Sequence, residues 1–290
     1  MSALLRSAAS ILAASVVALG WASAAEAAPQ PLKVCADPNN LPFSNSAGEG
    51  FENRIADIVA ADMGRTVEYT WWAQRRGFLR NTLKKGKCDV VMGVPIDLDM
   101  LATTRPYYRS RYVYVYRTDS GLDLHSMRDP RLRDLRIGVN LVGDDGTNPP
   151  PAHALGRQGI VDNVVGYLVY GDYKDAAPGR PIIDAVADGQ IDVAAVWGPL
   201  GGYFAREEPT PLTIAPITDG DSFAPLTFAF SIGMGVRKGD DDLRRTLDDV
   251  IARRHQDIQA VLRDYGVPLA GAGEDPQTLR SVDFQEGKGR

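Results

Sequence analysis

Short apolar runs alternate with amphipathic stretches through the first third of the chain. The runs at 32–36, 66–71 and 88–94 are bounded by turn residues and have the composition of buried strands. Between them, apolar residues recur at helical spacing over 50–64 and 76–85. Strands that alternate with helices predict a parallel sheet with right-handed crossovers.

The same alternation continues toward the C-terminus. Strands are predicted at 107–117, 136–141, 164–169, 191–197 and 228–236, and helices at 149–156, 181–187, from near Gly201, and over 240–265. Thr147 or Asn148 is the expected N-cap of the helix that begins in the prolines 149–151.

Two long strands divide this pattern. Turn residues at 118–121 end the first, and the strand 228–236 is long enough to cross back. We therefore predict an α/β protein of two lobes, with a central cleft and a two-stranded hinge. Lobe one takes residues 29–117 and 232–275 and lobe two takes 118–231, while 276–290 form a polar, glycine-rich, flexible tail.

The N-terminal segment differs from the rest. Arg6 precedes an apolar run at 8–21, and small residues at 22–27 offer cleavage sites, so 1–28 is predicted to be a secretory signal. The run is shorter than the roughly 20 residues of a membrane span, so we expect a mature chain without one, exported to the periplasm. A retained N-terminal anchor is the alternative.

Composition narrows the range of partners and of redox chemistry. The net charge of −5 argues against nucleic-acid binding. Cys35 and Cys88 are the only cysteines, and export to an oxidising compartment favours a disulfide between them. Two separate buried thiols are the alternative, because neighbouring strands do not automatically bring Cα atoms within about 4.4–6.8 Å.

Polar loops follow the predicted strands, and the carboxyl ends of strands are where open α/β sheets bind ligands. Strand 32–36 leads into a loop whose prolines and asparagines are expected to exclude both helix and sheet. Trp197 and Pro199 lie at the carboxyl end of another strand. Strand alternation should send Trp71 and Trp72 to opposite faces, one into the core and one with Arg75 at the cleft rim.

Catalytic and metal-binding patterns are absent from the sequence. Acidic pairs such as Asp97 with Asp99 lack the spacing of a calcium loop, and turn or capping roles suit them better. His125, His153 and His255 are scattered. No nucleophile elbow, phosphate loop or dinucleotide glycine pattern occurs, so we expect neither a resident metal, nor a cofactor, nor an enzyme.

In its order of segments the mature chain resembles the type II periplasmic solute-binding proteins. The segments that carry this resemblance are 32–43, 50–52, 86–93, 105–108 and 232–239. Residues 36–45, 148–155 and 195–205 look more narrowly like the homologues associated with quinoprotein alcohol dehydrogenases, the MxaJ/XoxJ group. This resemblance implies a periplasmic accessory of a pyrroloquinoline-quinone methanol dehydrogenase, with the dehydrogenase and its cytochrome c as partners.

The residues also argue against ordinary amino-acid uptake. Amino-acid-binding relatives hold the ligand carboxylate with an arginine after the third strand, whereas 94–102 contains carboxylates and no arginine. The prolines 149–151 remove backbone donors at the helix start of lobe two. Arg75, Arg76 or Arg105 could still supply the clamp.

The candidate residues for the cleft or for partner binding are Asp37, Asn39, Asn40, Phe43, Trp72, Arg75, Pro95, Asp97, Arg105, Tyr107, Thr147, Asn148, His153, Trp197 and Pro199. Two other functions compete with the accessory role. The fold alone would suit a solute-binding subunit of an ABC importer for a small polar molecule. A dehydratase built on this fold is the third, for which no acid–base pair is found.

Overall fold

The computed structural model describes residues 30–142 and 148–271. The predicted signal segment 1–28, Thr147 and the predicted tail 276–290 lie outside the described residues.

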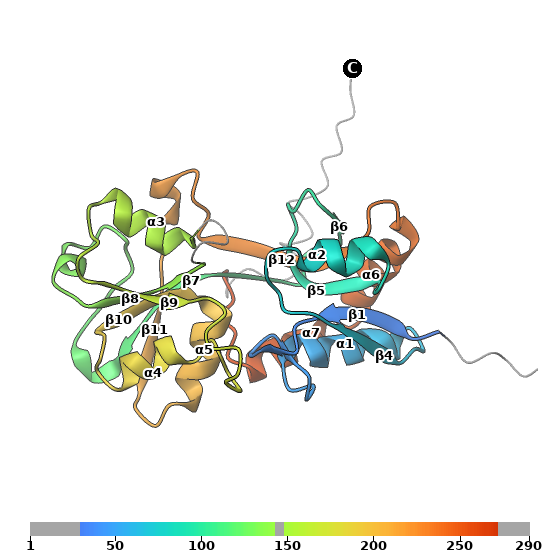
Figure 1. The fold of residues 1–290 in the computed structure, drawn as a ribbon, viewed down its shortest axis with the longest axis horizontal. Helices are drawn as coiled ribbons and strands as arrows, with labels where there is room; N and C mark the ends of the chain where they lie inside the picture. The colour runs from blue at the N-terminus through green and yellow to red at the C-terminus, as the bar shows by residue number, and fades with distance from the viewer. Residues whose placement is uncertain (1–29, 143–147, 272–290) are drawn as a thin grey trace, which may run out of the picture.

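One ten-stranded mixed sheet runs through both halves of the molecule (Figure 1). Its strands lie in the order β4 (Val67–Trp71), β1 (Leu32–Ala36), β5 (Val90–Pro95), β12 (Ala229–Val236), β7 (Tyr108–Arg117), β10 (Val193–Trp197), β8 (Ile137–Leu141) and β9 (Val164–Leu168). β6 (Ala102–Thr103) pairs with β12, and β11 (Leu212–Pro216) pairs with β7. β1 is parallel to β4 and β5, and β8 is parallel to β9 and β10, as alternating strands and helices predict.

Lobe one is built around β4, β1, β5 and part of β12. Its helices are α1 (Phe51–Asp62), α2 (Phe78–Asn81), α6 (Asp241–Arg253) and α7 (His255–Asp264). Phe51, Ile55 and Val59 are fully buried at helical spacing on one face of α1, which is the pattern that predicted this helix. The chain leaves α1 through Gly64, whose φ of 65° is easily adopted only by glycine.

Lobe two is built around β7, β10, β8 and β9, with helices α3 (Pro150–Arg157), α4 (Pro181–Ala187) and α5 (Gly198–Glu207). Alternation along β7 buries Tyr114 and Tyr116 on one face and Val113 and Val115 on the other, so a separate core lies on each face of the sheet. Short 3-10 turns connect the elements: η1 (Leu83–Lys85), η2 (Thr118–Ser120), η3 (Pro130–Arg133) and η5 (Gly220–Phe223).

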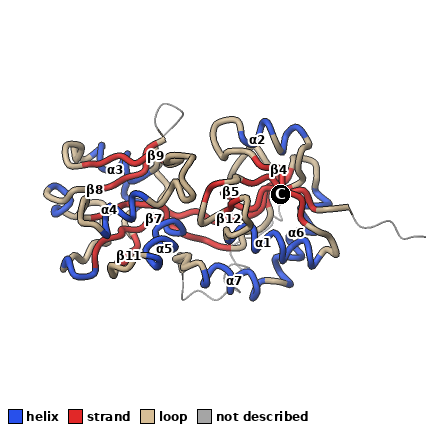
Figure 2. The backbone as a smooth tube through the Cα atoms, turned by 60° about the horizontal axis from the view of Figure 1, so that its bottom comes forward, coloured by secondary structure: helices blue, strands red, loops and turns tan. Residues whose placement is uncertain are grey.

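β7 and β12 cross between the lobes as an antiparallel pair (Figure 2). Residues 108–111 of β7 pair with β12, and from Tyr112 onward β7 pairs with β10. These two strands are the hinge of a type II periplasmic binding protein fold. The exact lobe boundaries at 117/118 and 231/232 remain our proposal.

Several predicted elements are shorter or broken. The loop after β1 was expected to exclude sheet, yet β2 (Asn39–Asn40) and β3 (Ser44–Asn45) pair in a small hairpin that contains the cis bond between Leu41 and Pro42. The helix at 76–85 is only α2 followed by η1. The tract 240–265 breaks at Arg254 into α6 and α7.

Two helix starts also differ from prediction. Asn148 does not cap α3, because Pro149 occupies the N-cap and the Asn148 side-chain oxygen accepts a hydrogen bond from the Val142 amide (3.0 Å). α5 begins at Gly198, before Gly201, with Pro199 in its first turn, where the missing N–H costs nothing.

The predicted disulfide joins Cys35 of β1 to Cys88, just before β5, with Cα atoms 5.5 Å apart. It ties together two neighbouring strands of lobe one. Across the described part of the chain, no helix combines the length and apolar composition needed to cross a membrane.

Candidate functional site

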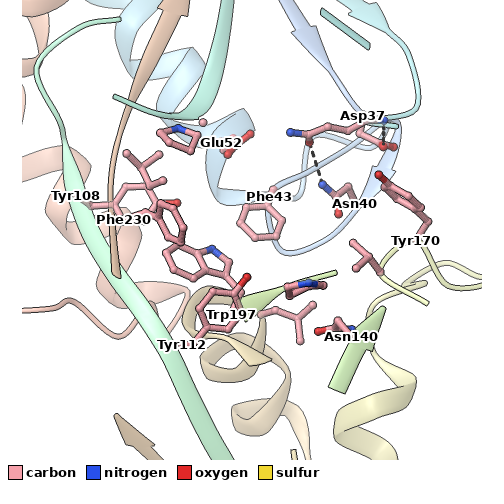
Figure 3. A pocket seen from close by; sticks show the side chains of 17 residues that line it. Asp37, Asn40, Phe43, Glu52, Tyr108, Tyr112, Asn140, Tyr170, Trp197 and Phe230 are labelled. Carbon is pink, nitrogen blue, oxygen red and sulfur yellow. Dashed lines mark hydrogen bonds between the residues drawn. The ribbon is translucent and has the colours of Figure 1, made fainter. Parts of the chain in front are cut away.

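A cavity of about 370 Å³ lies between the lobes at the hinge strands (Figure 3). Most of its wall is apolar, with six aromatic side chains: Phe43, Tyr108, Tyr112, Tyr170, Trp197 and Phe230. The Trp197 ring packs edge to face against Tyr112 (5.4 Å between centroids) and Phe230 (5.7 Å), so β10, β7 and β12 together form one aromatic side of the cavity.

The polar side chains of the wall are Asp37, Asn40, Glu52, Gln74 and Asn140. Among the described residues that line the cavity there is no lysine or arginine. A ligand carboxylate would therefore find no cation among these lining residues. This wall is unsuited to the zwitterion of a free amino acid.

Glu52 stands in the first turn of α1 and reaches into the cavity (Figure 3). A Cβ at Gly93 would lie 2.0 Å from the Glu52 Oε1 atom, so glycine is what lets the carboxyl group rest against β5. Burial raises the pKa of Glu52 to about 8, with no hydrogen bond or cation offsetting it. At neutral pH this group is mainly a neutral carboxylic acid, able to donate as well as accept a hydrogen bond.

The start of α1 is fixed beneath the loop that follows β1. The Asn53 Oδ1 atom accepts hydrogen bonds from the amides of Asn45 and Gly50, both at 3.1 Å. A Cβ at Gly50 would come within 2.1 Å of the Phe43 carbonyl oxygen, so only glycine allows this approach. These contacts hold Glu52 and Phe43 side by side at the cavity.

A set of contacts that we call the clasp, made by Asp37, Asn39, Arg75, Tyr170 and Tyr173, joins the loops of lobe one to the loop after β9 in lobe two. The Asp37 carboxylate accepts hydrogen bonds from the Asn39 amide (2.8 Å) and the Tyr173 hydroxyl. The Asn39 side-chain amide donates to the Tyr173 carbonyl (3.1 Å), and Arg75 lies over the rings of Tyr170 (5.1 Å) and Tyr173 (4.9 Å).

The lobes are also joined beside the hinge. The Arg206 guanidinium of α5 donates to the carbonyls of Arg263 (3.1 Å) and Asp264 (2.8 Å) at the end of α7. Tyr203 stacks on Tyr265 with 5.6 Å between ring centroids. The two lobes are thus held together at two places by the protein's own side chains.

The structure brings only part of the predicted candidate set to this place. The cavity wall includes Asp37, Asn40, Phe43, Pro95 and Trp197, and the clasp adds Asn39 and Arg75.

The remaining described candidates lie elsewhere. Trp72 is exposed beneath the Lys87 ammonium group, and Arg105 pairs with Asp248. The Tyr107 hydroxyl donates to the Met92 carbonyl inside lobe one, and Pro199 is buried in α5. Asp97 and Asn148 are outside the cavity wall, as is His153, whose buried Nε2 atom has no hydrogen-bond partner among the described residues.

Sequence reasoning missed Glu52, Gln74, Tyr108, Tyr112, Asn140, Tyr170 and Phe230. Alternation along the hinge strands could have indicated Tyr108 and Tyr112. They are four residues apart on β7, and residues separated by an even number of positions along a strand share one face. Nothing in the local sequence marks Glu52, because its position depends on how α1 packs against Gly93.

Among residues 30–142 and 148–271, no group of three or more His, Cys, Asp or Glu side chains is placed to hold a metal ion. Asp219, from one of the acidic pairs, accepts hydrogen bonds from the Ser126 hydroxyl (2.6 Å) and the Met127 amide (2.8 Å), a turn-stabilising role.

Comparison with known proteins places this chain in a family. Residues 32–267 match the model of bacterial extracellular solute-binding proteins, family 3. The protein MoxJ of Methylorubrum extorquens is 33% identical over 251 residues, which cover 82% of this chain and 81% of MoxJ.

Two solved structures are similar over most of their length. The periplasmic binding protein XoxJ from Methylobacterium extorquens AM1 is 38% identical, with a TM-score of 0.67 over 82% of this chain and 99% of XoxJ. MxaJ from Methlophaga aminisulfidivorans MPT is 28% identical, with a TM-score of 0.70 over 82% of this chain and all of MxaJ (100%). The chain therefore belongs to the bacterial extracellular solute-binding proteins of family 3, and within that family it is a homologue of MoxJ, XoxJ and MxaJ.

Proposed function

We propose that this protein is a non-enzymatic periplasmic accessory of a pyrroloquinoline-quinone-dependent methanol dehydrogenase. It binds the dehydrogenase and assists its maturation or activation, with the cytochrome c of the same system as a further partner. Support comes from the similarity to MoxJ, XoxJ and MxaJ and from the segments that resemble proteins associated with quinoprotein dehydrogenases.

The cavity is the geometric observation that carries this proposal. Relatives that feed importers with amino acids need a cation for the ligand carboxylate, and the wall here presents Asp37 and Glu52 instead. Arg75 and Arg105, the alternative clamps, are engaged by the clasp tyrosines and by Asp248. Arg76 is exposed outside the wall.

Reconstitution tests the accessory role. Apo-dehydrogenase is incubated with the quinone cofactor and its metal ion, with and without this protein, and methanol-dependent dye reduction is followed. We expect a higher yield of active enzyme with the protein, and a complex of the two by size-exclusion chromatography. No complex together with an unchanged yield would contradict the proposal.

Membership of a solute-binding family favours a second function, delivery of a small polar molecule to an ABC importer. The cavity volume is compatible with such a ligand. Thermal unfolding with amino acids, alcohols and amines separates the two functions, because a ligand at 100 times its Kd should stabilise the protein by about 2.7 kcal/mol. A turnover assay of the same compounds tests the absence of catalysis.

A further inference from the structure

One stretch of lobe one carries positive charge without any negative charge. From Thr70 to Cys88 the sequence contains no Asp or Glu, on a chain whose net charge is −5. The stretch follows β4 and includes α2 and η1. Its six cations, which we call the basic cap, are Arg75, Arg76, Arg80, Lys84, Lys85 and Lys87, and all six are exposed.

The basic cap contrasts with several arginines elsewhere in the molecule that are paired with carboxylates. Arg136 pairs with Asp192 at 2.6 Å, and Arg244 with Asp248 at 3.1 Å. Among the described residues, no ion pair is formed by any cation of the basic cap. Apart from Arg75, which lies over the clasp tyrosines, the cations of the basic cap are therefore available to a partner.

Apolar surface accompanies this charge. A second cavity of about 370 Å³, which we call the cap pocket, is lined by Arg75, Phe78, Leu79, Arg80, Leu98 and Met100, among others. Met100 is 42% exposed at this pocket, and Trp72, beneath Lys87, is 40% exposed. Exposed large apolar residues next to unpaired arginines are typical of the centres of protein interfaces.

The position of the basic cap leaves it accessible. α2 lies on the opposite side of the lobe-one sheet from α1 and α7, and both views show it on the outside of the molecule (Figures 1 and 2). The helices α1, α6 and α7 cover the other side and pack against each other.

We propose that the basic cap and the cap pocket form a docking surface for an acidic protein segment. An apolar side chain of that segment enters the cap pocket between Arg75 and Arg80, and flanking carboxylates face Lys84, Lys85 and Lys87. The pocket favours a protein over an extended anionic surface, because a flat surface cannot fill a cavity of about 370 Å³ and a protruding apolar side chain can enter it. Taking the dehydrogenase as the protein that carries this segment rests on the proposed function.

Paired charge reversals test the surface. Lys84→Glu with Lys85→Glu is compared with Lys174→Glu with Lys238→Glu, which changes the net charge equally at exposed lysines outside the basic cap. Isothermal titration with the dehydrogenase should show the first pair weakening binding by about tenfold, with the control pair close to wild type. Raising salt from roughly 0.05 to 0.3 M should weaken wild-type binding and leave the first pair less affected.

A peptide of glutamates around one central leucine tests the surface independently of the dehydrogenase. It should bind wild type more tightly than the same peptide with a central serine, and Met100→Glu should remove that preference. Peptide binding without dehydrogenase binding would overturn the proposed function and leave the docking surface standing. Three outcomes would overturn the docking surface. The two charge-reversal pairs could weaken binding equally, or the first pair could leave dehydrogenase binding unchanged. The third outcome is that the protein binds anionic vesicles and not the peptide.

Discussion

At the scale of single residues, Glu52 is a cavity group whose chemistry is changed by its surroundings. Three features combine there: a position in the first turn of α1, close contact with Gly93, and a half-buried place in a largely aromatic cavity wall. A carboxylic acid that is neutral at pH 7 gives the cavity a hydrogen-bond donor without adding a positive charge.

The raised pKa of Glu52 predicts a particular dependence of stability on pH. Between its ordinary value of 4.5 and about 8, the folded state holds a proton that the unfolded state has released. Stability therefore falls as pH rises through this window, by up to about 1.4 kcal/mol per pH unit from this group. Glu52→Gln should remove that slope, so urea unfolding should show the variant gaining on wild type from pH 5 to pH 8. A constant difference across this range would contradict the raised pKa.

At the scale of elements, the sequence predicted most strands and helices because each carries a strong local signal. α1 is an example, with apolar residues at helical spacing before Gly64. Broken elements were less predictable. The side-chain hydroxyl of Thr82 bonds to the Phe78 carbonyl at 2.7 Å, and Gly77 and Gly86 take positive φ at either end of α2 and η1, which no periodicity reveals.

The cavity was predicted only in outline, for a related reason. Asp37 follows β1 and Trp197 ends β10, and the position at a strand's carboxyl end predicted both at the cleft. Residues such as Tyr170 reach it from a loop whose path depends on the closure of the lobes. Tertiary contact of this kind leaves no pattern in the neighbouring sequence.

The start of α1 should be sensitive to Asn53. Asn53→Ala leaves the buried amides of Asn45 and Gly50 without their acceptor, which predicts a loss of about 2 kcal/mol in unfolding free energy. Arg54→Ala, at the exposed neighbouring position, is the matched control and should change stability by less than about 0.5 kcal/mol. Equal losses in both variants would show that the Asn53 contacts are not responsible.

The disulfide should contribute substantially to lobe one. Cys35 and Cys88 are 53 residues apart in sequence, and closing a loop of this size stabilises a fold by about 4 kcal/mol in the chain-entropy model. Cys35→Ser with Cys88→Ser should lower the urea midpoint accordingly. The reducing agent dithiothreitol should lower the midpoint of wild type and leave that of the variant unchanged; an unchanged wild-type midpoint would count against the bond.

At the scale of the whole molecule, the two lobes are held together by the clasp and by the contacts of Arg206 with the end of α7. Both sets of contacts are made by the protein's own side chains. Closure is therefore a property of the chain, whereas hinge proteins of this kind commonly close around what they bind.

Weakening the clasp should open the molecule. Tyr173→Phe with Asn39→Ala removes the hydroxyl that donates to Asp37 and the amide that donates across the lobes. Spin labels on the two lobes, measured by double electron–electron resonance, should show a longer and broader distance distribution than in wild type. Tyr167→Phe, within β9 of lobe two, is the control and should leave the distribution unchanged. Identical distributions in all three proteins would contradict a role for the clasp in closure.

The clasp also has a consequence for recognition of this protein by a permease. A permease that binds the closed conformation of its binding protein uses that conformation as the sign that a ligand is bound. Here the lobes are held together by contacts within the chain, so the closed conformation would carry no information about a ligand. If such a permease bound this protein, the expected result is binding without transport, in competition with ligand-loaded binding proteins. Selection would therefore act against recognition of this protein by a permease.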